Sequence, residues 1–281
     1  MTGAAWAASN FASSTHASLG DDALKDDDNA AWVADLPGPV GRRWVERIRA
    51  IRLADRLSEE KELRPRSLRS AGHGLPALEI LGAQDDEGAA AVRAAWARYL
   101  AALRAYQRRD LRVATLADHR TMLERLSGSL FQLFPFLLPR QREAIRGFGA
   151  LDQFFNNLRD LAEDAAHGIC YFPEDALARA GLRREQVTGD GWRAAPGWRK
   201  LMRHWIGEYL PGLERGAARF DACGDLHPSL ERMRRECRSR YARILHLYRA
   251  VDFDFQLFAG EYWREVRSRA EPAGAAVTRA G

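Results

Sequence analysis

The chain has 281 residues, of which 46% are hydrophobic and 29% charged. This composition is typical of a folded globular protein and excludes a chain that is mainly disordered. The net charge of +5 rests almost entirely on arginine, because Lys25, Lys61 and Lys200 are the only lysines. No basic stripe with interleaved aromatic residues occurs, so a nucleic-acid partner is not expected.

Residues 1–28 are rich in Ala, Ser, Gly and Asp and lack a sustained hydrophobic period, which predicts a mobile tail. Residues 29–268 are expected to form one all-α domain, and residues 269–281 a disordered tail. Helical periods run through the domain, with breakers between them and no convincing alternating strand. They begin near Pro39 and continue through residues 88–109, 115–135, 140–166, 196–219 and 228–250.

Cysteine content and apolar runs bear on the location of the protein. Cys170, Cys223 and Cys237 lack C-x-x-C spacing, so neither a disulfide framework nor a zinc site is expected. No basic and apolar leader precedes the domain, and the apolar run from Leu130 to Leu138 is too short to span a membrane. A cytoplasmic protein is expected, at most resting on a membrane surface.

Short polar side chains recur along one predicted helix in the middle of the chain. At 3.6 residues per turn, one face carries Gln153, Asn156 or Asn157, Asp160 and Asp164. Surface helices usually carry longer Lys, Glu and Arg side chains, whereas Asp residues four apart bring oxygens within reach of one hard cation. The pattern favours a Mg²⁺ site completed by phosphate, with an ordinary amphipathic surface helix as the alternative.

The segment from Asn156 to Pro173 reads N-x-L-R-D-x-x-E-D-x-x-x-G-x-x-Y-F-P. It resembles the second aspartate-rich motif of the squalene/phytoene synthase family, which includes dehydrosqualene synthases. Gln153 also stands where that family has a Gln, and weaker similarity extends from about Leu36 to Phe253. The resemblance implies a single-domain, isoprenoid-synthase-like helical bundle around a central cavity.

A second, weaker match lies upstream, where Arg52, Asp55 and Glu59 resemble the family's first motif, an Arg three residues before Asp-x-x-x-Asp. Arg56 replaces the second Asp of the usual pair. Glu59 replaces the distal Asp and keeps a carboxylate with a longer reach. The alternative is a solvated ladder of ion pairs along the helix.

The stretch before this helix also departs from the family, because acidic residues stand where a Ser-Phe element usually holds a diphosphate. Carboxylates repel phosphate unless a cation lies between them. An alternative register would use Asp22 and Asp26 as the first motif, although little helix-forming sequence precedes them.

Two more segments resemble the family. Gly128, within Ser127-Gly128-Ser129, matches a mid-chain pair of small residues that lets helices approach beside the prenyl-chain tunnel. Phe131 stands at the next small position and would shorten a tunnel that it lines. Tyr241 matches a Tyr of the family's late helix that faces the pocket.

The resemblance implies a prenyltransferase that condenses two allylic diphosphates, of farnesyl or geranylgeranyl type, head to head, with Mg²⁺-assisted release of pyrophosphate. The metal ligands would be Asp160, Asp164, Asn156, Asp55 and Glu59. The catalytic residues would be the four carboxylates and Tyr241. The substrate contacts would be Arg52, Gln153, Asn156, Arg159, Gly128 and Phe131.

Arg159 would pair with phosphate oxygens, with an exposed helix charge as the alternative, and His167 is expected at a surface turn. NADPH would serve a reductive step, but no glycine-rich nucleotide loop indicates it. Prenyl diphosphates are the expected partners, and a lipophilic product is compatible with contact at a membrane surface. The sequence carries no signal for an oligomeric state.

Two other functions are compatible with the same fold. An enzyme with one diphosphate site, either a terpene synthase or a prenyltransferase that uses another acceptor, would explain the weakened first motif and the bulky Phe131. A non-catalytic partner subunit that has kept one motif is the remaining alternative.

Overall fold

The computed structural model describes residues 31–59, 86–106 and 111–270. The predicted tail at 1–28, the alternative register at Asp22 and Asp26, and residues 271–281 lie outside the described residues. So does the side chain of Glu59, although its backbone ends the first long helix. The last helix reaches Ala270, two residues beyond the predicted end of the domain.

The described part of the chain is helical throughout and contains no strand, as predicted. The longer helices are α3 (Gly38–Glu59), α6 (Asp86–Tyr106), α9 (Pro139–Arg159), α14 (Leu210–Asp221), α15 (Pro228–Ala250) and α16 (Phe255–Ala270). The shorter helices are α7 (Leu116–Leu123), α8 (Ser129–Phe131), α10 (Leu161–Ala166), α11 (Glu174–Ala180), α12 (Arg184–Val187) and α13 (Gly197–His204). Single 3-10 turns form η1 (Ala31–Asp35) and η3 (Asp190–Trp192), and π-helical turns form η2 (Glu124–Gly128) and η4 (Trp205–Tyr209).

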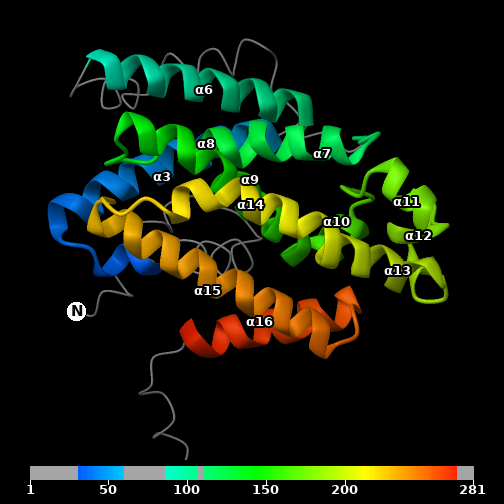
Figure 1. The fold of residues 1–281 in the computed structure, drawn as a ribbon. Coiled ribbons are helices and arrows are strands. Elements are labelled where there is room, and N and C mark those ends of the chain that lie inside the picture. Colours follow the sequence, from blue (N-terminus) through cyan, green and yellow to red (C-terminus); the bar gives the residue numbers. More distant parts are fainter. Residues whose placement is uncertain (1–30, 60–85, 107–110, 271–281) are drawn as a thin grey trace, which may run out of the picture.

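The helices are stacked in layers, with α9 and α14 in the middle (Figure 1). In that view α6 lies at the top, α7 and α8 lie beneath it, and α15 and α16 lie at the bottom. The short helices α11, α12 and α13 gather at one end of the stack. Each helix therefore has an apolar side to bury against a neighbouring layer.

Helix starts follow local chemistry. Thr115 caps α7 by accepting a hydrogen bond from the Asp118 backbone N–H at 3.1 Å, and Asp118 accepts one from the Thr115 backbone in return. Pro139 and Pro228 stand in the first turns of α9 and α15, where a missing N–H costs nothing. Gly181 ends α11 with φ of 72°, a left-handed conformation that glycine adopts without strain.

Helix α9 is packed tightly on two sides because its middle turn carries two glycines. A Cβ atom on Gly147 would lie 2.2 Å from the backbone oxygen of Gly216 on α14. A Cβ atom on Gly149 would lie 2.3 Å from the backbone oxygen of Ser127 on η2. These distances are far below van der Waals contact, so only glycine lets α9 approach both neighbours this closely.

The helix α16 was not among the predicted helices, although its residues lay within the predicted domain. Its buried stripe consists of Phe255, Phe258, Tyr262 and Val266. That spacing of three and four residues is a regular helical signal. The stripe packs under α15, where the Tyr248 and Phe258 rings stack at 4.0 Å.

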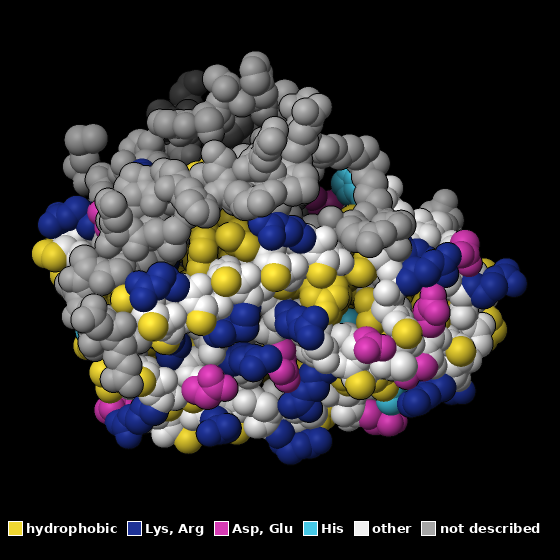
Figure 2. Space-filling model, turned by 90° about the horizontal axis from the view of Figure 1, so that it is seen from above, with side chains coloured by type: hydrophobic (Ala, Val, Ile, Leu, Met, Phe, Trp, Pro, Cys, Tyr) yellow, Lys and Arg dark blue, Asp and Glu magenta, His cyan; other side chains and the backbone are white. Residues whose placement is uncertain are grey.

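The surface carries charges of both signs. On the face shown in Figure 2, Lys and Arg side chains lie among acidic and apolar ones rather than in a continuous basic band. Within the described residues, every helix is too short or too polar to cross a membrane.

Candidate active site

The predicted polar stripe lies where α9 gives way to α10. Helix α9 ends at Arg159, and Asp160 adopts φ −92° and ψ 4° before α10 begins at Leu161. The predicted spacing survives this break, because the Asp164 N–H still donates to the Asp160 carbonyl at 2.9 Å. The stripe is therefore carried by the long helix α9 and the short helix α10 rather than by one continuous helix.

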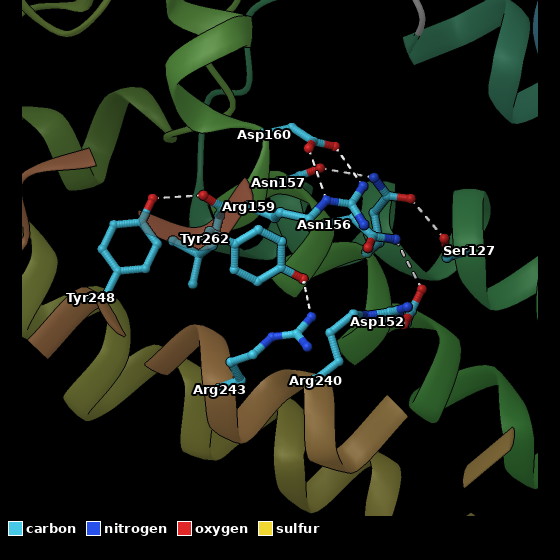
Figure 3. A network of polar contacts seen from close by, with 12 residues as sticks. Ser127, Asp152, Asn156, Asn157, Arg159, Asp160, Arg240, Arg243, Tyr248 and Tyr262 are labelled. Atoms are coloured by element: carbon cyan, nitrogen blue, oxygen red, sulfur yellow. Dashed lines mark hydrogen bonds and ion pairs between the residues drawn. The ribbon is translucent and has the colours of Figure 1, made fainter. Parts of the chain in front are cut away.

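Arg159 and Asp160 form a two-point ion pair at this break (Figure 3). Nε and a terminal nitrogen of Arg159 donate to the two carboxylate oxygens of Asp160 at 2.9 and 2.8 Å. The two side chains are 4% and 21% exposed, so the alternative of an exposed helix charge at Arg159 is wrong. Burial alone would lower the pKa of Arg159, but the Asp160 carboxylate outweighs it and the net shift is upward.

Asp152, eight residues before Asp160, is a second buried carboxylate. One of its oxygens accepts hydrogen bonds from Arg240 at 2.6 Å and from the Tyr241 hydroxyl at 2.7 Å. Its other oxygen accepts from Nδ2 of Asn156 at 2.9 Å. Tyr241 thus lies in the polar network, and burial beside Asp152 raises its pKa well above the ordinary value. That Tyr241 faces a substrate pocket stays a prediction.

A parallel chain of hydrogen bonds reaches the same turn from η2. The Ser127 hydroxyl donates to Oε1 of Gln153 at 2.7 Å, and Nε2 of Gln153 donates to Oδ1 of Asn157 at 2.8 Å (Figure 3). Two buried polar atoms at this turn have no hydrogen-bond partner in the described part of the chain: Oδ1 of Asn156 and Nδ2 of Asn157. One is an acceptor and the other a donor, so the turn offers both kinds of contact to a ligand.

Two buried tyrosines lie beside the site, one on α15 and one on α16. The Tyr248 hydroxyl of α15 donates to the Leu158 carbonyl at 2.6 Å. Burial, followed by the nearby charges of Asp160 and Asp164, raises the pKa of Tyr248 well above its ordinary value. On α16, the Tyr262 hydroxyl accepts from Arg243 at 2.8 Å. These contacts place both motif carboxylates beside a buried aromatic layer.

The first acidic motif has different surroundings. Asp55 lies on α3 and accepts a hydrogen bond from the Tyr99 hydroxyl of α6. Burial raises the pKa of Asp55 to about 6, against the opposing effects of Tyr99 and Arg52. Asp55 thus has a partner on α6, and Asp160 has one in Arg159, the last residue of α9.

The other predicted residues lie in or near the core. A Cβ atom on Gly128 would lie 3.0 Å from the Arg146 carbonyl, so the predicted close approach of helices at this small residue is confirmed. Phe131 is buried against Phe134, with ring centroids 4.5 Å apart. His167 is exposed at the end of α10, as predicted. Contact of Gly128 and Phe131 with a prenyl chain stays a prediction.

The donors at the second motif suit a hard cation. In the described ranges, no three His, Cys, Asp or Glu side chains gather into a group that could hold a metal ion by themselves. The oxygen donors at this motif are the carboxylates of Asp160, which Arg159 already contacts, and of Asp164, together with the unpartnered Oδ1 of Asn156. All are oxygens, which Mg²⁺ prefers, and Mg²⁺ usually keeps positions for water and substrate phosphate. This set fits Mg²⁺.

Several residues of the network were not predicted. Asp152 stands four residues before Asn156, on the same helix face as Asn156 and Asp160, and that spacing is a signal for it. Arg240 adjoins the predicted Tyr241, but nothing in a run of arginines distinguishes a buried one. Tyr99, Tyr248 and Tyr262 resemble ordinary core aromatics at sequence level.

Comparison with known proteins identifies the family of the chain. The family model for squalene/phytoene synthase matches residues 89–270, nearly two thirds of the chain. A chloroplastic phytoene synthase of Narcissus pseudonarcissus is 42% identical over 64 residues, which are 22% of this chain and 14% of that protein. Phytoene synthase 2 of Oryza sativa subsp. japonica is 34% identical over 82 residues, or 28% of this chain and 20% of that protein.

The matched segments therefore span at most a fifth of these two relatives. A crystal structure of a dehydrosqualene synthase in complex with ligand superposes with a TM-score of 0.58 at 17% identity. The match covers 95% of this chain and 99% of that chain, and the two share the fold.

Proposed function

Since the chain belongs to the squalene/phytoene synthase family, we propose that it is a prenyltransferase that joins two allylic prenyl diphosphates head to head. In this reaction the C–O bond of one diphosphate breaks and pyrophosphate leaves. The resulting allylic cation then alkylates the double bond of the second molecule, and loss of a proton from the adduct neutralises the new carbocation. The observation that carries the proposal is the half-buried polar turn of α9 and α10, which holds two buried, unpartnered amide atoms of Asn156 and Asn157 as well as the carboxylates of Asp160 and Asp164.

The residues of this turn would have three roles: binding the metal ion, binding phosphate and orienting a carboxylate. Asp160, Asp164 and Oδ1 of Asn156 would hold Mg²⁺, which supplies Lewis-acid stabilisation of the departing diphosphate. The free Nδ2 of Asn157 would donate to a phosphate oxygen, with Gln153 holding the opposite end of that amide. Arg159 would keep the Asp160 carboxylate turned toward the cation.

Buried aromatic residues would protect the cation from water. Phe155 and Tyr241 stack with ring centroids 4.3 Å apart, directly behind the polar turn. Phe148 lies next to Tyr241 at 6.1 Å. Such π-faces stabilise positive charge and exclude nucleophilic water.

The test is incubation of purified protein with farnesyl or geranylgeranyl diphosphate and Mg²⁺, followed by product identification by mass. We expect a hydrocarbon or diphosphate that contains two prenyl units, together with pyrophosphate release. Asp160→Ala should reduce release at least about 100-fold, because a ligand of the cation is lost. Equal release by wild type and Asp160→Ala would contradict the proposal, and no release by either would favour a non-catalytic subunit.

A second candidate function is supported by the first motif. Asp55 is half-buried, and one of its carboxylate oxygens already accepts a hydrogen bond from the Tyr99 hydroxyl instead of being open to a cation. An enzyme with a single working diphosphate site would then act on one prenyl unit. A product with one prenyl unit in the same assay would favour this candidate over head-to-head condensation.

A further inference from the structure

The orientation of the Asn156 side chain is set by one hydrogen bond. Its Nδ2 donates to Asp152 at 2.9 Å, while its Oδ1 is buried and has no partner in the described part of the chain. An amide carries a donor end and an acceptor end, so a flip of the side chain would exchange the two. A buried acceptor without a partner is unfavourable, which indicates that a ligand supplies the missing contact.

Asp152 itself has little freedom to turn. Arg240 and Tyr241 both donate to its Oδ1, and the Asp152 and Arg240 side chains are 6% and 7% exposed. These two donors come from α15, so they hold the carboxylate from outside α9 (Figure 3). The remaining oxygen, Oδ2, can accept a hydrogen bond but cannot donate one, so it admits only the NH₂ end of Asn156.

We infer that Asp152 is a positioning residue that fixes the Asn156 amide with its carbonyl oxygen turned toward the bound cation. The three residues Asp152, Asn156 and Asp160 follow at steps of four along the helix, so the carboxylate, the amide and the metal ligand share one face. This inference rests on the proposed function, since it assigns Asn156 a cation to face. Arg240 and Tyr241 act indirectly, because their hydrogen bonds hold Asp152, which in turn orients Asn156.

A substitution at Asp152 should turn the amide over. In Asp152→Asn, the new side chain must keep its oxygen toward Arg240 and Tyr241, which leaves its NH₂ facing Asn156. Asn156 must then flip to accept that hydrogen bond and would present its own NH₂ to the cation. We expect Mn²⁺, a stand-in for Mg²⁺, to bind about 10- to 100-fold more weakly in the presence of inorganic pyrophosphate.

The reciprocal exchange Asp152→Asn with Asn156→Asp should restore binding. The carboxylate introduced at position 156 would accept from the NH₂ introduced at position 152 with one oxygen and offer its other oxygen to the cation, at unchanged net charge. Affinity is measured by electron paramagnetic resonance of free Mn²⁺ and by calorimetry. The matched control is Asp221→Asn, which loosens a different ion pair with α15, through Arg238, and should leave Mn²⁺ affinity unchanged.

The possible results separate the inference from the proposed function. Weaker binding in Asp152→Asn that the exchange restores to within about 3-fold supports the inference. The inference is overturned if Asp152→Asn binds Mn²⁺ as tightly as wild type. It is also overturned if the affinity lost in Asp152→Asn is not restored by the reciprocal exchange. If circular dichroism shows that Asp152→Asn is unfolded at the assay temperature, the exchange variant alone decides. Mn²⁺ affinity within about 3-fold of wild type supports the inference, and weaker affinity overturns it.

Asp160→Asn is measured in parallel to locate any failure. If Asp160→Asn loses most of its Mn²⁺ affinity while Asp152→Asn keeps it, the metal site of the proposed function stands and only the orienting role of Asp152 is refuted. Failure of wild type to bind Mn²⁺ with pyrophosphate overturns both the metal site of the proposed function and the inference.

Discussion

Arg159 and Asp160 are neighbours in the chain, and their side chains form a two-point ion pair whose guanidinium is almost fully buried. Lysine keeps the charge but cannot make two parallel hydrogen bonds to one carboxylate. We expect Arg159→Lys to lower the free energy of unfolding by about 1.5–3 kcal/mol, the usual contribution of a hydrogen bond to a charged group. Urea unfolding followed by circular dichroism measures this change.

The exposed pair of Arg199 and Asp252 provides the control. Its side chains are 60% and 64% exposed, so Arg199→Lys should change stability by less than about 0.5 kcal/mol. Equal effects of the two substitutions would show that burial does not strengthen the pair at Arg159.

His119 makes stability depend on pH. The ring is fully buried on α7, and burial lowers the pKa of His119 to about 3 from 6.5. Between these values the unfolded chain binds a proton that the folded chain excludes. The His119 contribution is therefore fully present above pH 6.5 and is lost as pH falls toward 3, with a slope of up to about 1.4 kcal/mol per unit.

We expect His119→Phe to flatten this pH dependence between pH 6.5 and 4, as measured by urea unfolding at each pH. The exposed His246 serves as the control, because His246→Gln should leave the wild-type slope unchanged. A slope in His119→Phe as steep as that of wild type would contradict the assignment to His119.

At the scale of helices, the position of the site depends on how closely α9 approaches its neighbours. Gly149 meets the backbone of Ser127, whose hydroxyl starts the hydrogen-bond chain through Gln153 to Asn157. Gly149, which allows the helices to cross closely, therefore contacts Ser127, which donates the first hydrogen bond of the chain that reaches Asn157. The crossing occurs at η2, one of the π-helical turns, which often lie at functional sites.

We expect Gly149→Ala to destabilise the protein by about 1–3 kcal/mol, because its Cβ would clash with backbone that cannot rotate away. Gly260→Ala on α16 is the matched control, since nothing lies within 4 Å of its Cβ position. That substitution should stabilise α16 by up to about 1 kcal/mol, the helix propensity difference. Thermal unfolding of both variants should therefore shift in opposite directions.

At the scale of the whole molecule, ligand binding should stabilise the fold, because the site joins α9 and α10 to α15 and α16. Mg²⁺ and pyrophosphate together at about 100 times their dissociation constant would add about 2.7 kcal/mol, or roughly 5–10 °C in Tm. We expect this shift to disappear with a chelator and to fall by more than half in Asp164→Asn. Differential scanning fluorimetry measures it.

Asp225→Asn is the control for this experiment, because Asp225 pairs with Arg140 at the start of α9, at the opposite end of that helix from Asp160. It should retain the full Tm shift. A shift that survives in Asp164→Asn would place the stabilising ligand elsewhere.

The all-α fold and the second motif were predictable from local patterns. Helical periodicity needs only neighbouring residues, and the run from Asn156 to Pro173 is specific enough to indicate its family. The break at Asp160 was not predictable, because the same residues have adequate helix propensity and the interruption depends on what packs around them. The burial of Arg159 was equally hidden, since arginine is exposed in most proteins.

The amino-acid sequence by itself determined the all-α class and most of its long helices, which face of α9 is polar and which family the motif resembles. These are properties of spacing along one chain. Only the tertiary structure decided that Asp152 is held by Arg240 and Tyr241, and that Asp55 accepts a hydrogen bond from Tyr99. Those partners lie 44 to 89 residues apart in the chain, and the folded packing alone selects them from many arginines and tyrosines of equal local character.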